Sequence, residues 1–115
     1  MTLVRTTVNG SAVAVQALDA NTTGDYNSAV GSGALQSNTT ASSNTAVGYI
    51  ALYTNTTGAG NVAVGDQALE ANTTANYNTA VGNKALEANT TGGSNVAVGR
   101  NALLVATTAD YNTAI

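Results

Sequence analysis

The sequence contains no cysteine, histidine, phenylalanine or tryptophan, and each absence excludes something. A chain without cysteine forms no disulfide and offers no thiolate to a metal ion. Without histidine or cysteine it also lacks two of the commonest catalytic side chains of enzymes. The apolar fraction is 43%, but it is mostly alanine and valine, with five tyrosines as the aromatic residues. A single compact core would therefore be short of bulky side chains.

Charged residues are also scarce. The chain has three cations and six acidic residues, for a net charge of -3. Arg5, Lys84 and Arg100 form no cluster, so the basic patch that nucleic-acid binding needs is missing. No run of about 18 apolar residues occurs, so the sequence predicts no membrane-spanning helix.

A 17-residue repeat begins at Gly10 and continues without insertion or deletion. Six copies fill residues 10–111 and residues 112–115 start a seventh, whereas residues 1–9 are expected to form an N-terminal cap or an inter-subunit segment. With Gly10 as position 1, most copies have Asn at position 1, Ala-Val-Gly at 3 to 5, Ala-Leu at 8 and 9, and Asn-Thr-Thr at 12 to 14. A fixed period of this kind indicates a stack of similar coils.

Each copy is too short for two helices and reads as short β-strands. We predict one strand at positions 2–5, with a bend at the Gly of position 5. We predict a second strand at positions 7–11 and a corner at Asn-Thr-Thr-Gly that closes the coil. The predicted fold class is all-β, a parallel β-solenoid with 17-residue coils about 4.8 Å apart. Asn at positions 1 and 12 can hydrogen-bond along the stack and can tolerate the left-handed backbone that corners demand. The expected structural ladders are Asn27, Asn44, Asn61, Asn78, Asn95, Val30, Val47, Val64, Val81, Val98, Leu35, Leu52, Leu69 and Leu86.

The pattern also indicates self-association. Ala at position 3 and Val at position 4 are strand neighbours that face opposite sides, and neither gives way to a polar residue. The Ala-Leu pair at positions 8 and 9 follows the same pattern. One face would pack inside the chain and the other against an identical chain, so we expect a homo-oligomer of three chains. The alternative is that Ala is small enough to be tolerated outside.

The two ends suggest a filament. Residues 1–9 would fill positions 9–17 of a preceding coil, and residues 112–115 fill positions 1–4 of a following one. The tail of one chain and the head of the next would nearly complete a coil, which predicts head-to-tail stacking. The alternative is that the sequence is a fragment of a longer repeat protein.

The segment Asn-Thr-Ala-Val-Gly, at residues 44–48 and 78–82, resembles the head repeats of trimeric autotransporter adhesins. The longer phrase NTAVGYIALYTNTTG also resembles repeats of bacteriophage tail fibres and related bacterial surface proteins. The resemblance covers residues 10–115 and implies a left-handed parallel β-roll that trimerises. This chain differs from the adhesin repeats in its longer period.

Tyrosines are the main candidates for contact with a partner or a glycan. Tyr26, Tyr77 and Tyr111 share position 17, whereas Tyr49 and Tyr53 flank one Ala-Leu pair. Exposed Tyr rings can stack on sugars or anchor a protein. The alternative is that they cover corners and chain boundaries.

Three further patterns carry separate hypotheses. Glu70 and Glu87, at position 10 of adjacent coils, would hold a cation or else form solvated surface beside Lys84. Asn at position 12 and Thr at position 14 would form an outward ladder of the kind used by ice-binding solenoids. The Asn-Thr-Thr segments also match the glycosylation acceptor pattern, which repetition alone would generate. The matching residues are Asn21, Asn38, Asn55, Asn72 and Asn89.

These observations favour a stiff rod, a structural segment of an extracellular fibre or filament on a cell surface or a virion. Its expected partner is itself, with no nucleic acid and no membrane insertion. The acidic residues fall at variable positions and no nucleophile has an orienting partner, so we expect no enzyme, cofactor or metal site. One alternative is an adhesin head that binds a host glycan or matrix through the tyrosines. A second alternative is an ice-binding solenoid.

Overall fold

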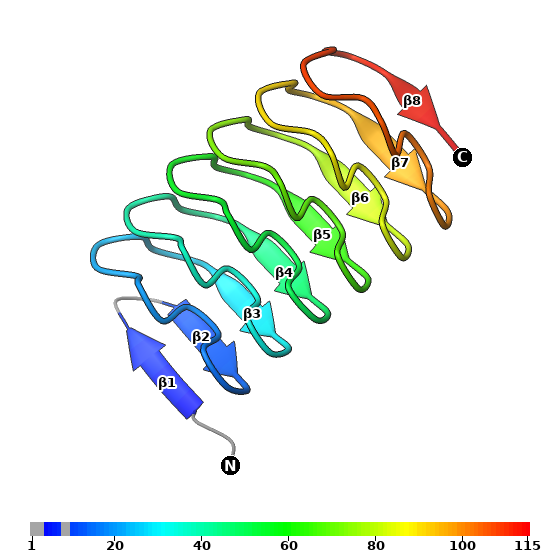
Figure 1. Cartoon of the computed structure of the whole chain (residues 1–115). Coiled ribbons are helices and arrows are strands. Elements are labelled where there is room, and N and C mark those ends of the chain that lie inside the picture. Colours follow the sequence, from blue (N-terminus) through cyan, green and yellow to red (C-terminus); the bar gives the residue numbers. More distant parts are fainter. Residues whose placement is uncertain (1–3, 8–9) are drawn as a thin grey trace.

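A computed structural model describes residues 4–7 and 10–115, with side chains from residue 14 onward, as a stack of coils (Figure 1). All strands lie in one sheet whose order follows the sequence, and β1 is antiparallel to β2 whereas the later pairs are parallel. The strands are β1 (Val4–Thr7), β2 (Gly10–Val13), β3 (Ser28–Val30), β4 (Thr45–Val47), β5 (Val62–Val64), β6 (Thr79–Val81), β7 (Val96–Val98) and β8 (Thr113–Ala114). Within the described residues there is no helix long and apolar enough to cross a membrane.

The register of the parallel pairs equals the period of the sequence. Ala29 of β3 pairs with Ala46 of β4, and Ala46 pairs with Ala63 of β5. Each residue therefore lies beside the residue at the same position of the next coil. The predicted all-β parallel solenoid with 17-residue coils is confirmed, and the stack measures 34 × 25 × 16 Å.

The predicted second strand at positions 7–11 is wrong, because this part of each coil consists of turns. In one coil the Ala34 N–H donates to the Gly31 carbonyl at 3.1 Å, and the Gln36 N–H donates to the Gly33 carbonyl at 3.2 Å. The third residue of each turn has a positive φ, 73° at Gly33 and 52° at Leu35, as in type II turns. The strands β3 to β7 cover positions 2–4, and β2 also includes position 1.

Because turns do not alternate sides, Ala at position 8 and Leu at position 9 both point inward. The prediction that they face opposite sides is therefore wrong. Ala at position 3 is also fully buried, so three apolar side chains from each coil make a narrow continuous core. Its largest members are Leu18, Leu35, Leu52, Leu69 and Leu86.

The turns still pair with neighbouring coils, so a hydrogen-bond ladder runs around the whole coil. The Leu52 N–H donates forward to the Ala68 carbonyl at 3.0 Å. The Ile50 N–H donates backward to the Ser32 carbonyl at 2.9 Å. These bonds satisfy backbone groups that a buried or stacked turn would otherwise leave unpaired.

Glycine at position 5 provides the predicted bend and a close approach between coils. Gly65 has φ of 138°, and a Cβ built there would lie 2.5 Å from the carbonyl oxygen of Gly82 in the next coil. A side chain at Gly65 would therefore strain the backbone and press against the next coil, although the first coil has Ala14 at this position with φ of 120°.

The two asparagine ladders are confirmed, and they meet inside the stack. The Asn72 Nδ2 donates to the Asn55 Oδ1 of the preceding coil at 2.9 Å and to the Ala75 carbonyl at 3.1 Å. Asn61, at position 1, donates its Nδ2 to the same Ala75 carbonyl at 2.8 Å, and its Oδ1 accepts the Asn78 backbone N–H at 2.9 Å. Both columns are buried. Their amides supply the closing corner with internal hydrogen bonds.

The asparagines at positions 1 and 12 do not use the left-handed backbone that they could tolerate. Among the described residues, positive φ values occur at positions 5, 7, 9 and 17 instead, as at Gln67, Leu69 and Tyr77. The asparagines act through their side chains, which reach neighbouring coils, while the bends are made elsewhere.

The N-terminal strand does not continue the repeat backward from Gly10 as predicted. The register of β1 joins Val4 to Val13 and Thr7 to Gly10, antiparallel to the coils. Residues 4–7 therefore run against the direction of a coil and do not occupy positions 9–17 of one. The rest of the predicted segment, residues 1–3 and 8–9, lies outside the described residues.

Candidate functional site

One candidate surface is the outward side of the sheet, formed by positions 2 and 4 of the coils. Ala at position 3 is fully buried, whereas Val30, Val47, Val81 and Val98 at position 4 are 36–44% exposed. Position 2 adds Thr45, Val62, Thr79 and Val96, all partly exposed. The alternation predicted for positions 3 and 4 is therefore confirmed, and we call the outward side the valine face.

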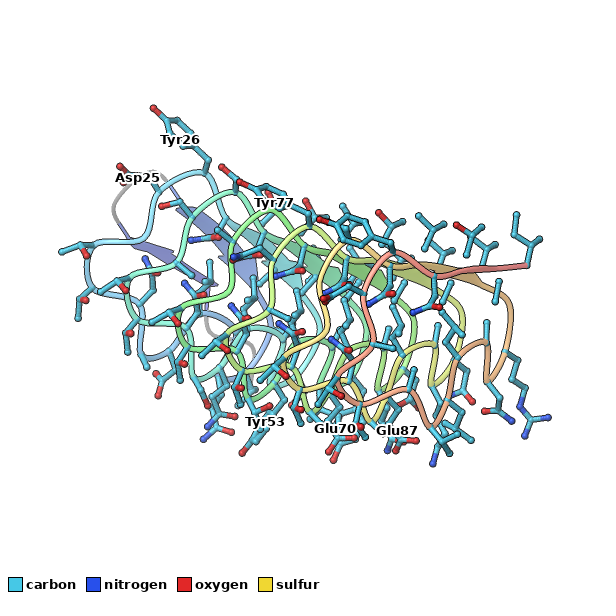
Figure 2. All side chains as sticks on the ribbon, turned by 90° about the horizontal axis from the view of Figure 1, so that it is seen from above. Asp25, Tyr26, Tyr53, Glu70, Tyr77 and Glu87 are labelled. Carbon is cyan, nitrogen blue, oxygen red and sulfur yellow. The ribbon has the colours of Figure 1, made fainter. Side chains whose placement is uncertain are left out.

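Three tyrosines extend the side of the molecule that carries the sheet. Tyr26, Tyr77 and Tyr111 are 72%, 68% and 83% exposed. Figure 2 shows Tyr26 and Tyr77 on the side of the sheet, away from Tyr53, Glu70 and Glu87. No copy of the repeat has a charged residue at positions 2, 4 or 17. The valine face is therefore uncharged along the stack, with an apolar valine column at position 4 beside a column of Ser, Thr and Val at position 2.

A second candidate lies on the opposite side, where positions 6, 7 and 10 of adjacent coils form an open groove of about 330 Å³. Tyr49 and Tyr53 line it from one coil, and Glu70 lines it from the next. The structure thus brings Tyr49 and Tyr53 together and separates them from the other tyrosines. The complete lining, which we call the tyrosine groove, is Gln16, Ser32, Gly33, Gln36, Tyr49, Ile50, Tyr53 and Glu70.

The groove exists because two adjacent coils depart from the repeat together. Position 7 holds Gln, Ile, Lys or Asn in the other coils, whereas Gly33 has no side chain there. A Cβ on Gly33 would lie 3.0 Å from Ile50 Cγ2 and 3.3 Å from Tyr53 Cδ2, so these side chains close over the gap. Sequence reasoning singled out the tyrosines but missed Gly33 and Gln36. The sequence contained a signal for the groove, because residues at positions 6, 7 and 10 of adjacent coils lie side by side.

The polar side chains of the groove are available to a ligand. Within the part of the chain that the structure describes, no hydrogen bond joins Gln36, Tyr49, Tyr53 or Glu70 through its side chain to another residue. Tyr49 is 55% exposed, whereas Tyr53 is partly covered. The groove therefore offers aromatic surface, amide groups and one carboxylate with unused hydrogen-bonding capacity.

Glu70 is a partly buried carboxyl group in an acidic neighbourhood. Burial, followed by the negative charges of Glu87 and Asp66, raises the pKa of Glu70, and Lys84 opposes this by lowering it. The Lys84 Nζ lies 3.5 Å from Glu87 Oε1, so the neighbouring carboxylate already has a cationic partner. No group of three or more metal-ligating side chains occurs among the described residues.

Burial of the position 12 asparagines changes two hypotheses. Asn38, Asn55, Asn72 and Asn89 are fully buried and Asn21 nearly so, so a glycan cannot be attached to them in the folded chain. The outward Asn–Thr ladder of the ice-binding hypothesis is also wrong, because only its threonine column, at position 14, is exposed.

The chain matches no protein-family model, no curated protein and no solved structure.

Proposed function

We propose that this chain is a structural segment of an extracellular or viral fibre, in which identical chains associate through the valine face. The observation that carries the proposal is the column of partly exposed valines on an uncharged sheet face. The seven strands of the coils lie about 4.8 Å apart, and each strand is roughly 13 Å long, so the sheet face covers on the order of 400 Å². Exposed surfaces with a continuous apolar column commonly mark interaction sites.

The partner that best fits this face is another copy of the chain. A repeating surface matches a repeating surface with the same 17-residue register, and symmetric self-association is the usual arrangement of identical chains. Three chains are the number that the resemblance to adhesin heads implies. Paired backbone ladders around each coil would supply the stiffness of the rod.

The mass of the native assembly tests this proposal. We expect a complex of more than one chain, and Val64→Lys should dissociate it because an ammonium group would be buried in the centre of the contact. The matched control is Ser32→Arg on the opposite side, where position 6 already holds Arg100 in a later coil. A monomeric natural chain, or a Val64→Lys variant that assembles like the control, would contradict the proposal.

A binding role is favoured by a separate observation, the tyrosine groove. It lies on the side away from the valine face, so a rod assembled through that face would leave the groove open to solvent. The adhesin alternative therefore stays compatible with the structural role.

A further inference from the structure

The tyrosine groove is a local break in an otherwise uniform surface. Every other full coil carries at least one charged residue at positions 6, 7 and 10, whereas Ser32, Gly33 and Gln36 are followed by Tyr49, Ile50 and Tyr53. Six consecutive variable positions thus lack a charge. The only charged residue in the lining is Glu70, at one end.

The shape and chemistry of the groove fit a flat, amphipathic ligand. Tyr49 and Tyr53 supply aromatic surface, and their hydroxyl groups donate and accept hydrogen bonds. Gln16 and Gln36 add amides, which also both donate and accept. The groove is open and shallow, so it would cover one face of a ligand. These are the features that a sugar ring requires, since it has an apolar C–H face and a rim of hydroxyl groups.

Charge selects among sugars. The lining has one carboxylate and no cation, so it would accept hydrogen bonds from hydroxyl groups and repel an anionic sugar. We propose that the tyrosine groove binds a neutral pyranose residue of a glycan, with its C–H face on Tyr49 and Tyr53 and its hydroxyl groups toward Gln16, Gln36 and Glu70. This site does not depend on self-association through the valine face.

The affinity of one site should be low. An open groove buries little of its ligand, and a single sugar loses freedom on binding, so we expect a Kd of about 1 mM. Assembly of several chains would place several grooves on one particle and raise the apparent affinity for a multivalent glycan.

The test is a titration of the full chain with methyl glycosides of glucose, galactose and mannose, followed by amide chemical shifts. At least one neutral glycoside should give saturable shifts confined to the amides of Ser32, Gly33, Tyr49, Ile50 and their neighbours. Methyl glucuronide should bind more weakly than methyl glucoside. No saturable shift for any neutral glycoside, or equal binding of the glucuronide, would overturn the proposal.

The repeat itself provides variants that should keep the fold. Tyr53→Gln introduces glutamine, which the preceding coil has at the same position as Gln36. Gly33→Asn introduces asparagine, which a later coil has at the same position as Asn101, with a positive φ of 61°. Each should weaken binding at least about tenfold, the first by removing a ring and the second because its side chain needs the space that Ile50 and Tyr53 occupy. Tyr77→Gln, on the far side, is the matched control and should bind normally.

Self-association through the valine face and sugar binding in the tyrosine groove can be disproved independently of each other. Val64→Lys should bind the glycoside with unchanged affinity per chain even when the assembly is lost. Binding that survives both Tyr53→Gln and Gly33→Asn would place the sugar elsewhere and overturn the assignment of the groove.

Discussion

The asparagine column at position 12 ends at Asn89, and this predicts a stabilising substitution. The Asn89 Nδ2 donates to the Asn72 Oδ1 at 3.0 Å and to the Gly92 carbonyl at 2.9 Å. Its own Oδ1 is buried and, among the described residues, has no hydrogen-bond partner. Earlier Oδ1 atoms in the column accept the amide of the following coil, but that coil has Ala106 at position 12. We therefore expect Ala106→Asn to stabilise the fold.

The magnitude follows from two new hydrogen bonds. The introduced amide would donate to the Asn89 Oδ1 and to the Ala109 carbonyl, which already accepts the Asn95 Nδ2 at 2.8 Å. A buried unsatisfied acceptor costs about 1–3 kcal/mol, and each hydrogen bond contributes about 1 kcal/mol net. Residue 106 is only partly buried, and the longer side chain loses rotamer freedom. The expected gain in the free energy of unfolding is about 1 kcal/mol.

Urea denaturation would measure the gain, and amide hydrogen exchange would locate it in the last coil, residues 95–111. Local exchange is informative because the terminal coil of a stack can open before the rest. Thr108→Asn is the control, since it adds the same side chain at an exposed position that does not reach Asn89. The reasoning is refuted if Ala106→Asn leaves both measurements unchanged, or if Thr108→Asn stabilises as much.

Three other substitutions test the interior and the acidic cluster. Asn72→Ala removes three hydrogen bonds and should lower the free energy of unfolding by about 3 kcal/mol in urea denaturation; a loss below about 1 kcal/mol would contradict the role of the ladder. Gly65→Ala should cost about 3 kcal/mol or more, because φ of 138° and the carbonyl of the next coil both oppose a Cβ; a normal thermal midpoint would refute this. Burial first, and then Glu87, raises the pKa of Glu70 in the folded chain, so its carboxyl destabilises the fold as pH rises from the ordinary glutamate value through the raised pKa. Glu70→Gln should therefore be more stable than the natural chain at pH 7 and lose this advantage near pH 4, and an advantage that is larger at pH 4 would have the wrong sign.

The fold could be predicted from the sequence because the repeat fixes the register. An unbroken period places each residue beside its equivalent in the next coil, as Ala29 and Ala46 demonstrate. The asparagine ladders followed from the same logic, since identical polar side chains at that spacing can bond to one another. The sequence did not show on which face of the coil each side chain lies, because this depends on the backbone conformation at that position. The alternation rule succeeded for Ala46 and Val47, which lie on a strand, and failed for Ala51 and Leu52, which lie in turns.

The missed turns have a physical cause. Leucine rarely adopts a positive φ, so nothing in the Ala-Leu pair predicts that Leu52 has φ of 51°. The strain is offset by burial of the side chain in the core and by the Leu52 N–H bond to Ala68. Tertiary packing thus selects a conformation that local preference opposes, and a reading of one copy of the repeat cannot show it.

The tyrosine groove shows how a uniform stack can carry a distinct site. Positions 6, 7 and 10 point away from the core, so changes there leave the alanine, leucine and asparagine columns intact. Because the register is fixed, a change in one coil always lies beside the same position of the next. Gly33 alone would leave an empty gap, and Tyr53 alone would be one exposed ring. Together they make a floor and a wall from residues 20 positions apart. Function in such a chain is therefore to be sought where neighbouring copies depart from the repeat at the same positions.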